Sequence, residues 1–227
     1  MDLLLVKISV MLVPGLLAIV LHEVAHGYVA EQLGDPTARM LGRLTLNPLK
    51  HLDPFGLLVL FLVGFGWARP VPVNAVNFKR PRQDMIWVAL AGPVTNLLLA
   101  GFSALLLRLL LLLPAAGSHL GSFAVSLVEP LILMAGFSLY INLLLAVLNL
   151  LPVPPLDGGR VITGLLPERQ AHWLLRIEPI GFFLLIVLVF VTPLWDKALL
   201  PAVSIAAHWL AGPQVGAMQQ LIPFIGS

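Results

Sequence analysis

Long apolar runs dominate the hydrophobic pattern of this chain. A membrane-spanning helix needs about 20 mostly apolar residues, and three runs meet that length: Leu3–Leu33, Met85–Leu113 and about Phe123–Leu151. A fourth run, about Trp173–Leu194, also qualifies if Glu178 lies near its start. The pattern predicts an all-α polytopic membrane protein, with a core of three transmembrane helices plus one or more C-terminal helices.

The connection after the first span differs from an ordinary polar loop. In the stretch GRLTLN, Arg43 and Thr45 alternate with Leu44 and Leu46, which is the period-2 pattern of a strand. The run Gly56–Trp67 is too short for a span and is typical of a re-entrant or interfacial segment. The following ARPVPVN must be extended, because proline fixes φ and restricts the residue before it. We therefore predict a small membrane-associated β element after the first helix.

The two ends of the chain are less regular. The N-terminal run has no basic head and no small-residue cleavage site, so we expect a first transmembrane helix rather than a cleaved signal. The C-terminal tail is apolar but broken by prolines, which predicts an interfacial segment or short half-helices. The expectation is one membrane-embedded domain over residues 1–227. Its core would cover about 3–164, followed by a C-terminal helix and tail at about 165–227.

The composition supports the membrane assignment. Hydrophobic residues make up 59% of the chain and charged residues 11%, with a mean hydropathy of +0.98, whereas soluble domains carry about 25% charged residues. The formal net charge is only +2, without a basic patch interleaved with aromatics, so no nucleic-acid partner is expected. The absence of cysteine excludes disulfides and thiolate metal sites.

The basic residues indicate an orientation. Lysine and arginine concentrate in loops that stay on the cytoplasmic side. The connections after the first and third predicted spans hold ten of the thirteen: Arg39, Arg43, Lys50, Arg69, Lys79, Arg80, Arg82, Arg160, Arg169 and Arg176. The connection after the second span, PAAGSHLGSFAVS, holds none. We expect a multi-pass protein of the cell membrane whose first and third connections face the cytoplasm.

The first predicted span contains the motif His22-Glu23-Val24-Ala25-His26, which matches H-E-x-x-H. Residues four apart share one helix face, so both imidazoles can reach one zinc ion while Glu23 acts as a general base on its water. The alternative is two helix histidines with structural partners and a paired glutamate. Ionisable groups within a span are costly and usually functional, which favours the zinc site.

Catalytic zinc generally has three protein ligands and an open position, so one ligand is missing. Without cysteine, it must be a histidine, aspartate or glutamate. Asp157 in LNLLPVPPLDGGR follows the third span, on the same side as the motif if both helices descend to the cytoplasm. An ordinary Asp-Gly turn at a helix exit is the alternative. The shared side and the missing ligand favour zinc.

The paired motifs HEVAH and NLLPVPPLDGG resemble those of the site-2 protease family of intramembrane zinc metalloproteases. LAGPVTN and GFGWARPVPVN extend the likeness over about Leu3–Gly164. The resemblance implies one zinc ion per chain, bound by His22, His26 and Asp157, with Glu23 activating water. The chain is similar to a minimal form, without the PDZ or CBS domains of some members.

The resemblance also implies a function. The expected reaction is hydrolysis of a peptide bond within or near a transmembrane segment, in regulated intramembrane proteolysis or signal-peptide remnant clearance. The expected partners are a single-span membrane protein as substrate and the lipid bilayer, with the active site toward the cytoplasmic side. A divalent-metal transporter and a non-catalytic membrane scaffold are the alternatives. Neither needs Glu23, and the second and third spans show no path of acidic and histidine residues.

Two further features are candidates for contact with substrate. Asn96 and Asn149 lie in the second and third spans, where an amide either joins helices or donates to the oxyanion that forms from the substrate carbonyl. The predicted strand Arg43–Leu46 offers an edge on which an unwound substrate could pair by β-addition.

Overall fold

The computed structural model describes residues 3–56, 67–116 and 122–212. Contacts group the chain into two compact units. The first unit comprises residues 1–18, 96–147 and 189–227, and the second comprises residues 19–95 and 148–188. The segment expected to be re-entrant, Gly56–Trp67, falls almost entirely outside the described residues, as does the tail beyond residue 212.

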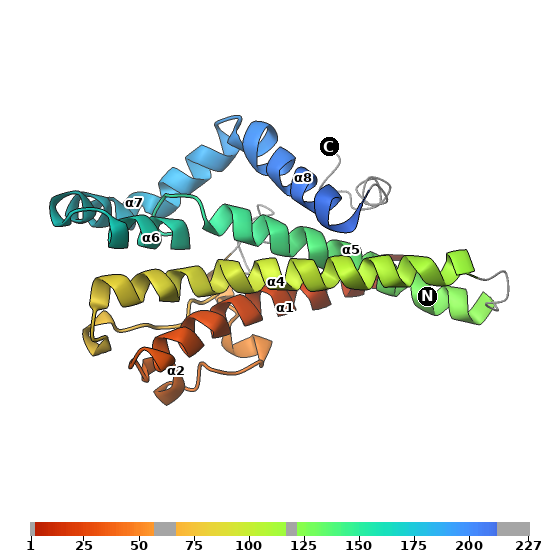
Figure 1. Ribbon diagram of the computed structural model, residues 1–227, viewed down its shortest axis with the longest axis horizontal. Coiled ribbons are helices and arrows are strands. Elements are labelled where there is room, and N and C mark those ends of the chain that lie inside the picture. The colour runs from red at the N-terminus through yellow and green to blue at the C-terminus, as the bar shows by residue number, and fades with distance from the viewer. Residues whose placement is uncertain (1–2, 57–66, 117–121, 213–227) are drawn as a thin grey trace. The chain divides into compact units, whose positions relative to one another are not determined.

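Three long helices correspond to the three predicted spans: α1 (Leu3–Gln32), α4 (Pro81–Ala116) and α5 (Ser122–Asn149). Each is long and apolar enough to cross a membrane, as Figure 1 illustrates by their length. Helices suit this setting because they satisfy their own backbone hydrogen bonds. The all-α prediction with a three-helix transmembrane core is therefore confirmed.

The C-terminal third adds shorter helices, as predicted. They are α6 (Asp157–Leu165), α7 (Glu168–Phe190), the π-helical turn η3 (Trp195–Leu199) and α8 (Leu200–Ala211). The expected fourth span forms α7, which begins five residues earlier than we expected and contains Pro179. Whether α7 crosses the membrane stays a prediction.

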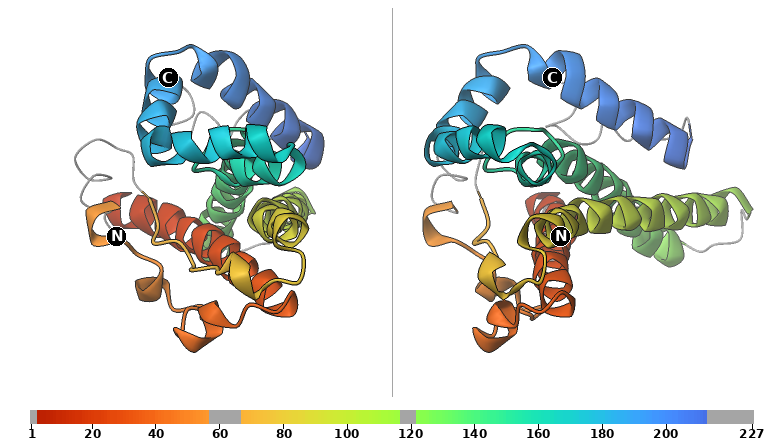
Figure 2. Two further views of the ribbon diagram at one scale, coloured as in Figure 1. Left: turned by 90° about the vertical axis from the view of Figure 1, so that its left-hand side faces the viewer. Right: turned by 60° about the vertical axis from the view of Figure 1, so that its left-hand side comes forward.

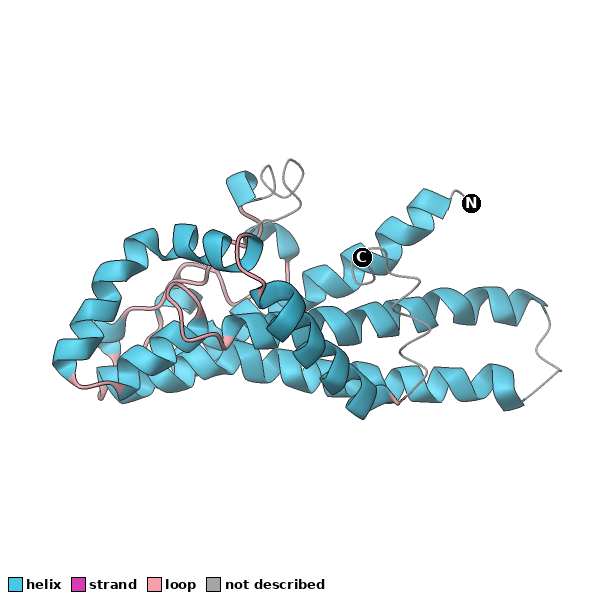
Figure 3. Ribbon diagram, turned by 90° about the horizontal axis from the view of Figure 1, so that it is seen from above, coloured by secondary structure: helices cyan, strands magenta, loops and turns pink. Residues whose placement is uncertain are grey.

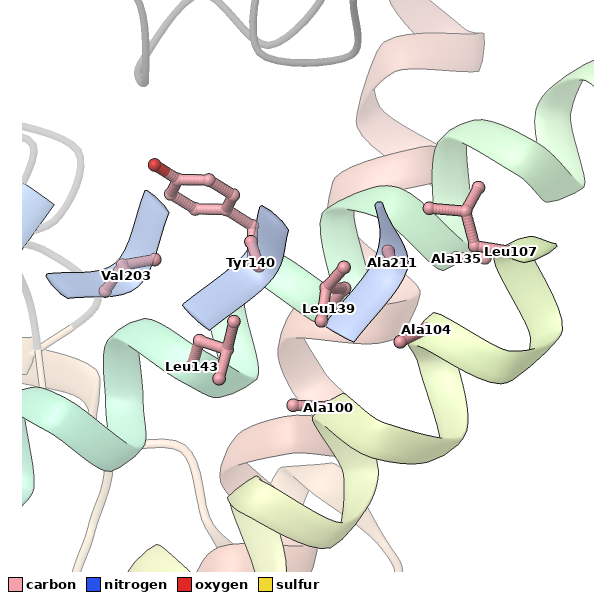
Figure 4. Packing of buried hydrophobic residues seen from close by; sticks show 10 residues of the cluster. Ala100, Ala104, Leu107, Ala135, Leu139, Tyr140, Leu143, Val203 and Ala211 are labelled. Atoms are coloured by element: carbon pink, nitrogen blue, oxygen red, sulfur yellow. The ribbon is translucent and has the colours of Figure 1, made fainter. Parts of the chain in front are cut away.

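The core of the first unit is built from α4, α5 and α8 (Figure 4). Small side chains let these helices approach closely: Ala100 and Ala104 of α4, Ala135 of α5 and Ala207 of α8 are all buried in one cluster. Within lipid, close packing of small residues replaces the hydrophobic drive that operates in water. By contrast, Leu98 and Phe102 of α4 are about two-thirds exposed and suit contact with lipid.

A line of buried polar side chains crosses the first unit. The Asn96 amide nitrogen donates to the Ala18 carbonyl at 3.2 Å and to Asn142 Oδ1 at 2.8 Å. Asn142 in turn donates to the Ser138 carbonyl, and the Ser103 hydroxyl donates to Ser138. These bonds tie α1, α4 and α5 together, because an unpaired amide within an apolar bundle is costly.

In the second unit, short elements surround the C-terminal turns of α1. They are α2 (Thr37–Met40), the 3₁₀ turns η1 (Pro48–Lys50) and η2 (Ala75–Asn77), and α6 and α7. Leu44, in the loop between α2 and η1, lies against Gly27 of α1. Figure 2 shows the orange segment that carries α2 beside the C-terminal part of α1. Arg82, near the start of α4, donates to the carbonyls of Gly164 and Leu166 at the end of α6. The second unit is thus held partly by side chains that satisfy loop carbonyls.

The predicted strand at Arg43–Leu46 is not confirmed. The described part of the chain consists of helices and loops (Figure 3), with one isolated antiparallel bridge between Leu52 and Ala68. Thr45 Oγ1 accepts from the Asn47 backbone, and His51 Nε2 donates to the Thr45 carbonyl at 2.8 Å. Such local bonds compete with strand pairing, and a period-2 pattern does not reveal them.

Asp35 links the loop that follows α1 to the loop that precedes α4, and both loops belong to the second unit. Its carboxylate is fully buried and accepts from Thr37, from the Asn74 backbone at 2.7 Å and from the Asn77 amide at 2.6 Å. Burial acts to raise the pKa of Asp35, but the hydrogen bonds from Thr37, Asn74 and Asn77 prevail and lower it. The carboxylate is therefore stabilised in its ionised form.

Replacing Asp35 with asparagine should lower stability at neutral pH. Each buried donor left without an acceptor costs about 1–3 kcal/mol. Because folding lowers the pKa of Asp35, its contribution is full above the unfolded pKa of about 3.9 and is lost as pH falls further. Melting curves in detergent from pH 7 to pH 3 should show the gap between wild type and Asp35→Asn narrow at the acidic end. A gap that stays constant with pH would contradict this origin, and Arg39→Met, at an exposed ion pair with Glu31, is the control.

Candidate metal centre

Helix α1 presents two histidines to one point. His22 and His26 lie one turn apart on the same face, and their rings are perpendicular, with centroids 4.6 Å apart. Asp157 arrives from the loop that follows α5, as the first residue of α6. The three side chains form a buried group whose ligand atoms could hold a metal ion, and each residue is at most 8% exposed.

The distances among the three ligand atoms match a zinc site. The two Nε2 atoms are 3.0 Å apart, and each lies 3.2 Å from Asp157 Oδ2. Ligands at about 2.0–2.1 Å from a tetrahedral zinc would be separated by about 3.3 Å. Asp157 Oδ2 is buried and accepts no well-formed hydrogen bond from the described residues. A cation at the centre of this triangle would satisfy all three atoms.

The tautomer of His26 also suits a metal. His26 Nδ1 lies 2.7 Å from the Val88 carbonyl, and a carbonyl can only accept, so Nδ1 carries the proton. In the neutral ring Nε2 is then free of hydrogen and presents its lone pair to the triangle. A metal-bound histidine usually donates its other ring N–H in this way.

The electrostatics hold Asp157 in its ionised, ligating form. Burial acts to raise the pKa of Asp157, but the imidazoles of His22 and His26, whose Nε2 atoms lie 3.2 Å from its Oδ2, hold that pKa well below its usual range. Asp157 also lies in the first turn of α6, where the helix dipole favours a negative charge.

Two glycines let the first turn of α6 approach the preceding loop. A Cβ on Gly158 would press against the carbonyl oxygens of Leu150 and Leu151, and one on Gly159 would come within 2.5 Å of the Pro154 nitrogen. Real Cβ atoms essentially never approach backbone so closely. The glycines after Asp157 therefore serve close packing, which fixes the position of the carboxylate.

A third glycine belongs to the site although it has no ligand atom. Gly92 of α4 faces both histidines, so a Cβ there would press on His26 Nε2 and lie 2.5 Å from His22 Cε1 and 2.7 Å from His22 Nδ1. The closeness of α4 to the imidazoles depends on this missing side chain. The metal centre thus has four supports: the turn of α1, the α6 terminus, Val88 and Gly92.

Glu23 is held by the backbone of the proline-rich segment. Its Oε2 accepts from the Val71 N–H at 2.8 Å, and Oε1 has no hydrogen bond with the described residues. Pro70 and Pro72 lack N–H groups, so Val71 carries the one backbone donor of this tripeptide. The carboxylate is oriented while one oxygen stays available.

A pocket of about 770 Å³ opens beside this arrangement. The extended segment Pro70–Val73 forms one wall, and Gly159, Thr163, Ala171 and Leu175 of α6 and α7 contribute to the rest. The pocket is linked to the site through Val71, which lines the pocket and binds Glu23. The residues His22, Glu23, His26 and Asp157 do not themselves line it. Most of the lining surface is apolar, with ionisable side chains of both signs among it: Arg82, Arg160, Glu168, His172 and Glu178.

Known proteins resemble this chain over most of its length. It is 47% identical over 189 residues to "Putative zinc metalloprotease YwhC" of Bacillus subtilis (strain 168), covering 81% of each chain. It is 34% identical over 201 residues to "Putative zinc metalloprotease Rip2" of Mycolicibacterium smegmatis, covering 85% of this chain and 71% of the relative. The model of Peptidase family M50 matches residues 118–192. No solved structure matches.

The chain belongs to peptidase family M50, the site-2 protease family. It is a multi-pass membrane metalloprotease with zinc as its cofactor. The resemblance inferred from HEVAH and NLLPVPPLDGG is thereby confirmed.

The structure of this M50 peptidase brings together the predicted ligands His22, His26 and Asp157, with Glu23 on the same turn of α1. Asn96 is engaged elsewhere, because both hydrogens of its amide are donated to Ala18 and Asn142, which favours the helix-joining interpretation over oxyanion binding. Asn149 ends α5, half-buried, and its role stays a prediction.

Sequence reasoning missed Gly92, Val71 and Val88. The motif LAGPVTN contains Gly92 and begins two residues after Val88, and ARPVPVN contains Val71. Neither motif reveals that a backbone carbonyl, a backbone N–H or a missing side chain is the feature that contacts the site. His51 and Asp53 have partners within their own loop: Asp53 Oδ1 accepts from the Gly56 N–H at 2.8 Å, and the buried His51 lies against the Thr45 carbonyl.

Adding one methyl group at Gly92 should weaken zinc binding. In Gly92→Ala the new Cβ would displace both imidazoles, so we expect the zinc content of the purified protein to fall to less than half that of wild type. Gly101→Ala is the matched control, because it lies on the same helix and its Cβ would meet nothing within 4 Å. Full zinc occupancy in Gly92→Ala, measured by mass spectrometry, would show that α4 does not fix the histidines.

Proposed function

We propose that this protein is an intramembrane protease that cuts a single-span membrane protein within or near its transmembrane segment. The observation that carries the proposal is the triangle of His22, His26 and Asp157 on a helix that is apolar enough to span the membrane, with Glu23 beside it. Ligands alone would suit a transporter or a scaffold. The oriented glutamate is the part that only hydrolysis requires.

In the proposed mechanism His22 Nε2, His26 Nε2 and Asp157 Oδ2 would hold the zinc ion. Zinc bound there would supply a Lewis acid for water and for the scissile carbonyl. Glu23 Oε1 accepts the proton of the attacking water and later delivers it to the leaving amine nitrogen. The Val71 N–H on Oε2 keeps the carboxylate from rotating between these two steps. Asn149 is the proposed donor to the developing oxyanion.

The pocket beside Pro70–Val73 is the proposed place for the substrate. A substrate helix has its carbonyls hydrogen-bonded, so it must unwind before attack. The extended wall of the pocket would contact the unwound segment through side chains and the carbonyl oxygens left available, because the one N–H of Pro70–Pro72 is donated to Glu23. In this proposal the wall takes the role that the sequence pattern gave to Arg43–Leu46. This location fits the pocket's contact with Val71, which also binds Glu23.

The proposed biological setting is regulated intramembrane proteolysis or clearance of signal-peptide remnants at the cell membrane. The basic residues of the first and third connections support an active site toward the cytoplasmic side. The lipid bilayer and the single-span substrate are the proposed partners.

Replacing Glu23 with glutamine should abolish cleavage and leave zinc in place. Glutamine keeps the shape and the bond to Val71, but it cannot accept the proton, and losing a general base costs about 10²–10⁴-fold in rate. The assay uses purified protein in liposomes with tagged single-span probes that carry a Gly-Pro pair inside the span, and products are sized by mass spectrometry.

Asp157→Ala provides the companion result, since it should lose both zinc and cleavage. Activity surviving in Glu23→Gln would refute the proposed base. Cleavage of probes only outside their spans would remove the intramembrane part of the proposal.

The orientation can be tested by single-cysteine labelling, because the chain has no native cysteine. Met40→Cys lies at a position 79% exposed in the first connection and should react with a membrane-impermeant maleimide in inverted vesicles. His119→Cys, in the second connection, should react in intact cells instead. The reverse pattern would place the first connection outside.

A further inference from the structure

Arg43 is a buried cation whose partners are backbone carbonyls. The residue is only 8% exposed, and its Nη2 donates to the Arg69 carbonyl at 2.7 Å and to the Pro70 carbonyl at 3.3 Å. No carboxylate of the described residues lies within ion-pair distance of it. Arginine is almost never fully buried unless it is paired, and the partners of this one belong to the segment that holds Glu23.

The Pro70–Val71 peptide group joins Arg43 to Glu23. Its oxygen accepts from Arg43, and its N–H donates to Glu23 Oε2. The peptide is planar and trans, so its oxygen and hydrogen point in opposite directions, one toward the guanidinium and the other toward the carboxylate. Both ends of the peptide dipole thus face the charge that stabilises them, and bonds in such a chain strengthen one another.

The neighbouring sequence limits other positions of this peptide. Pro70 and Pro72 fix φ on both sides of Val71 and supply no competing donor. The Arg69 N–H donates to the His51 carbonyl at 2.8 Å, which anchors the segment one residue earlier. Burial and the charge of Arg69 lower the pKa of Arg43, whereas the Glu23 charge raises it. An arginine remains a cation under these influences.

We propose that Arg43 is a positioning residue for Glu23, acting through the Pro70–Val71 peptide group. The inference rests on the function proposed above for Glu23 and adds the residue that sets its geometry. Arg43 holds the peptide plane, and the plane holds one oxygen of the glutamate, so that Oε1 faces the attacking water. Arg43 touches neither the metal ligands nor the substrate in this scheme.

The test compares Arg43→Met, Arg43→Lys and Arg39→Met in the liposome assay. Arg43→Met should lower kcat at least about tenfold, because small misplacements of a catalytic group are costly, while KM stays within about twofold. Zinc content and the visible spectrum of the cobalt-substituted protein should remain those of wild type. Arg43→Lys keeps the charge and should recover part of kcat. Arg39→Met removes an exposed cation of the same connection and should leave kcat unchanged.

A second variant acts at the other end of the peptide. Val71→Pro removes the N–H that Glu23 accepts, and it should lower kcat like Arg43→Met with zinc retained. Because both changes interrupt one connection, the double variant should be no slower than the slower single variant. Independent losses that multiply would overturn the proposal.

The remaining outcomes are decisive too. Wild-type kcat in Arg43→Met, or loss of zinc and activity together, would assign Arg43 to folding alone and overturn the inference. If Glu23→Gln stays active, the proposed function itself fails. If Glu23→Gln is inactive and Arg43→Met is not impaired, only the positioning role fails.

Discussion

Three buried lone pairs that face one point are the constraint on which the second unit depends. His22, His26 and Asp157 bring their ligand atoms within 3.2 Å of one another, an arrangement that a cation at its centre would stabilise. Surrounding elements hold it in place: Val88 fixes one ring, the loop after α5 delivers the carboxylate, and Gly92 leaves room. The packing of this unit and the geometry of its metal ligands therefore depend on the same residues.

The loops near the site are ordered by polar side chains rather than by a sheet. Asp35 gathers donors from two loops, Arg82 binds the end of α6, and Arg43 binds the segment that orients Glu23. These charges, buried at Asp35 and Arg43 and exposed at Arg82, meet backbone groups outside regular secondary structure. Irregular chain in apolar surroundings needs such partners. The proline-rich segment is thereby shaped into a wall beside the metal centre.

The sequence predicted the features that depend on periodicity and on chemical type. Apolar runs located α1, α4 and α5, and the i, i+4 spacing of His22 and His26 predicted their shared face. Asp157 followed from the missing ligand and the topology. Arg43–Leu46 was wrong as a strand, because its side chains bond locally and across to residues more than twenty positions away. The hydrogen bonds of Asn96 to Ala18 and Asn142 favour helix joining, and its place in catalysis was open from the sequence because such partners depend on the three-dimensional fold.

Gly92, Gly158 and Gly159 contribute to the metal centre by the atoms that they lack. Alanine is chemically the mildest replacement for glycine. At these positions it is expected to be among the most disruptive, because its Cβ would overlap neighbouring atoms. A mutational scan that ranks positions by lost functional groups would pass over them. The shape of the active site therefore depends on positions without a side chain as well as on the ligands. Substitutions that add a side chain at each position would locate those positions.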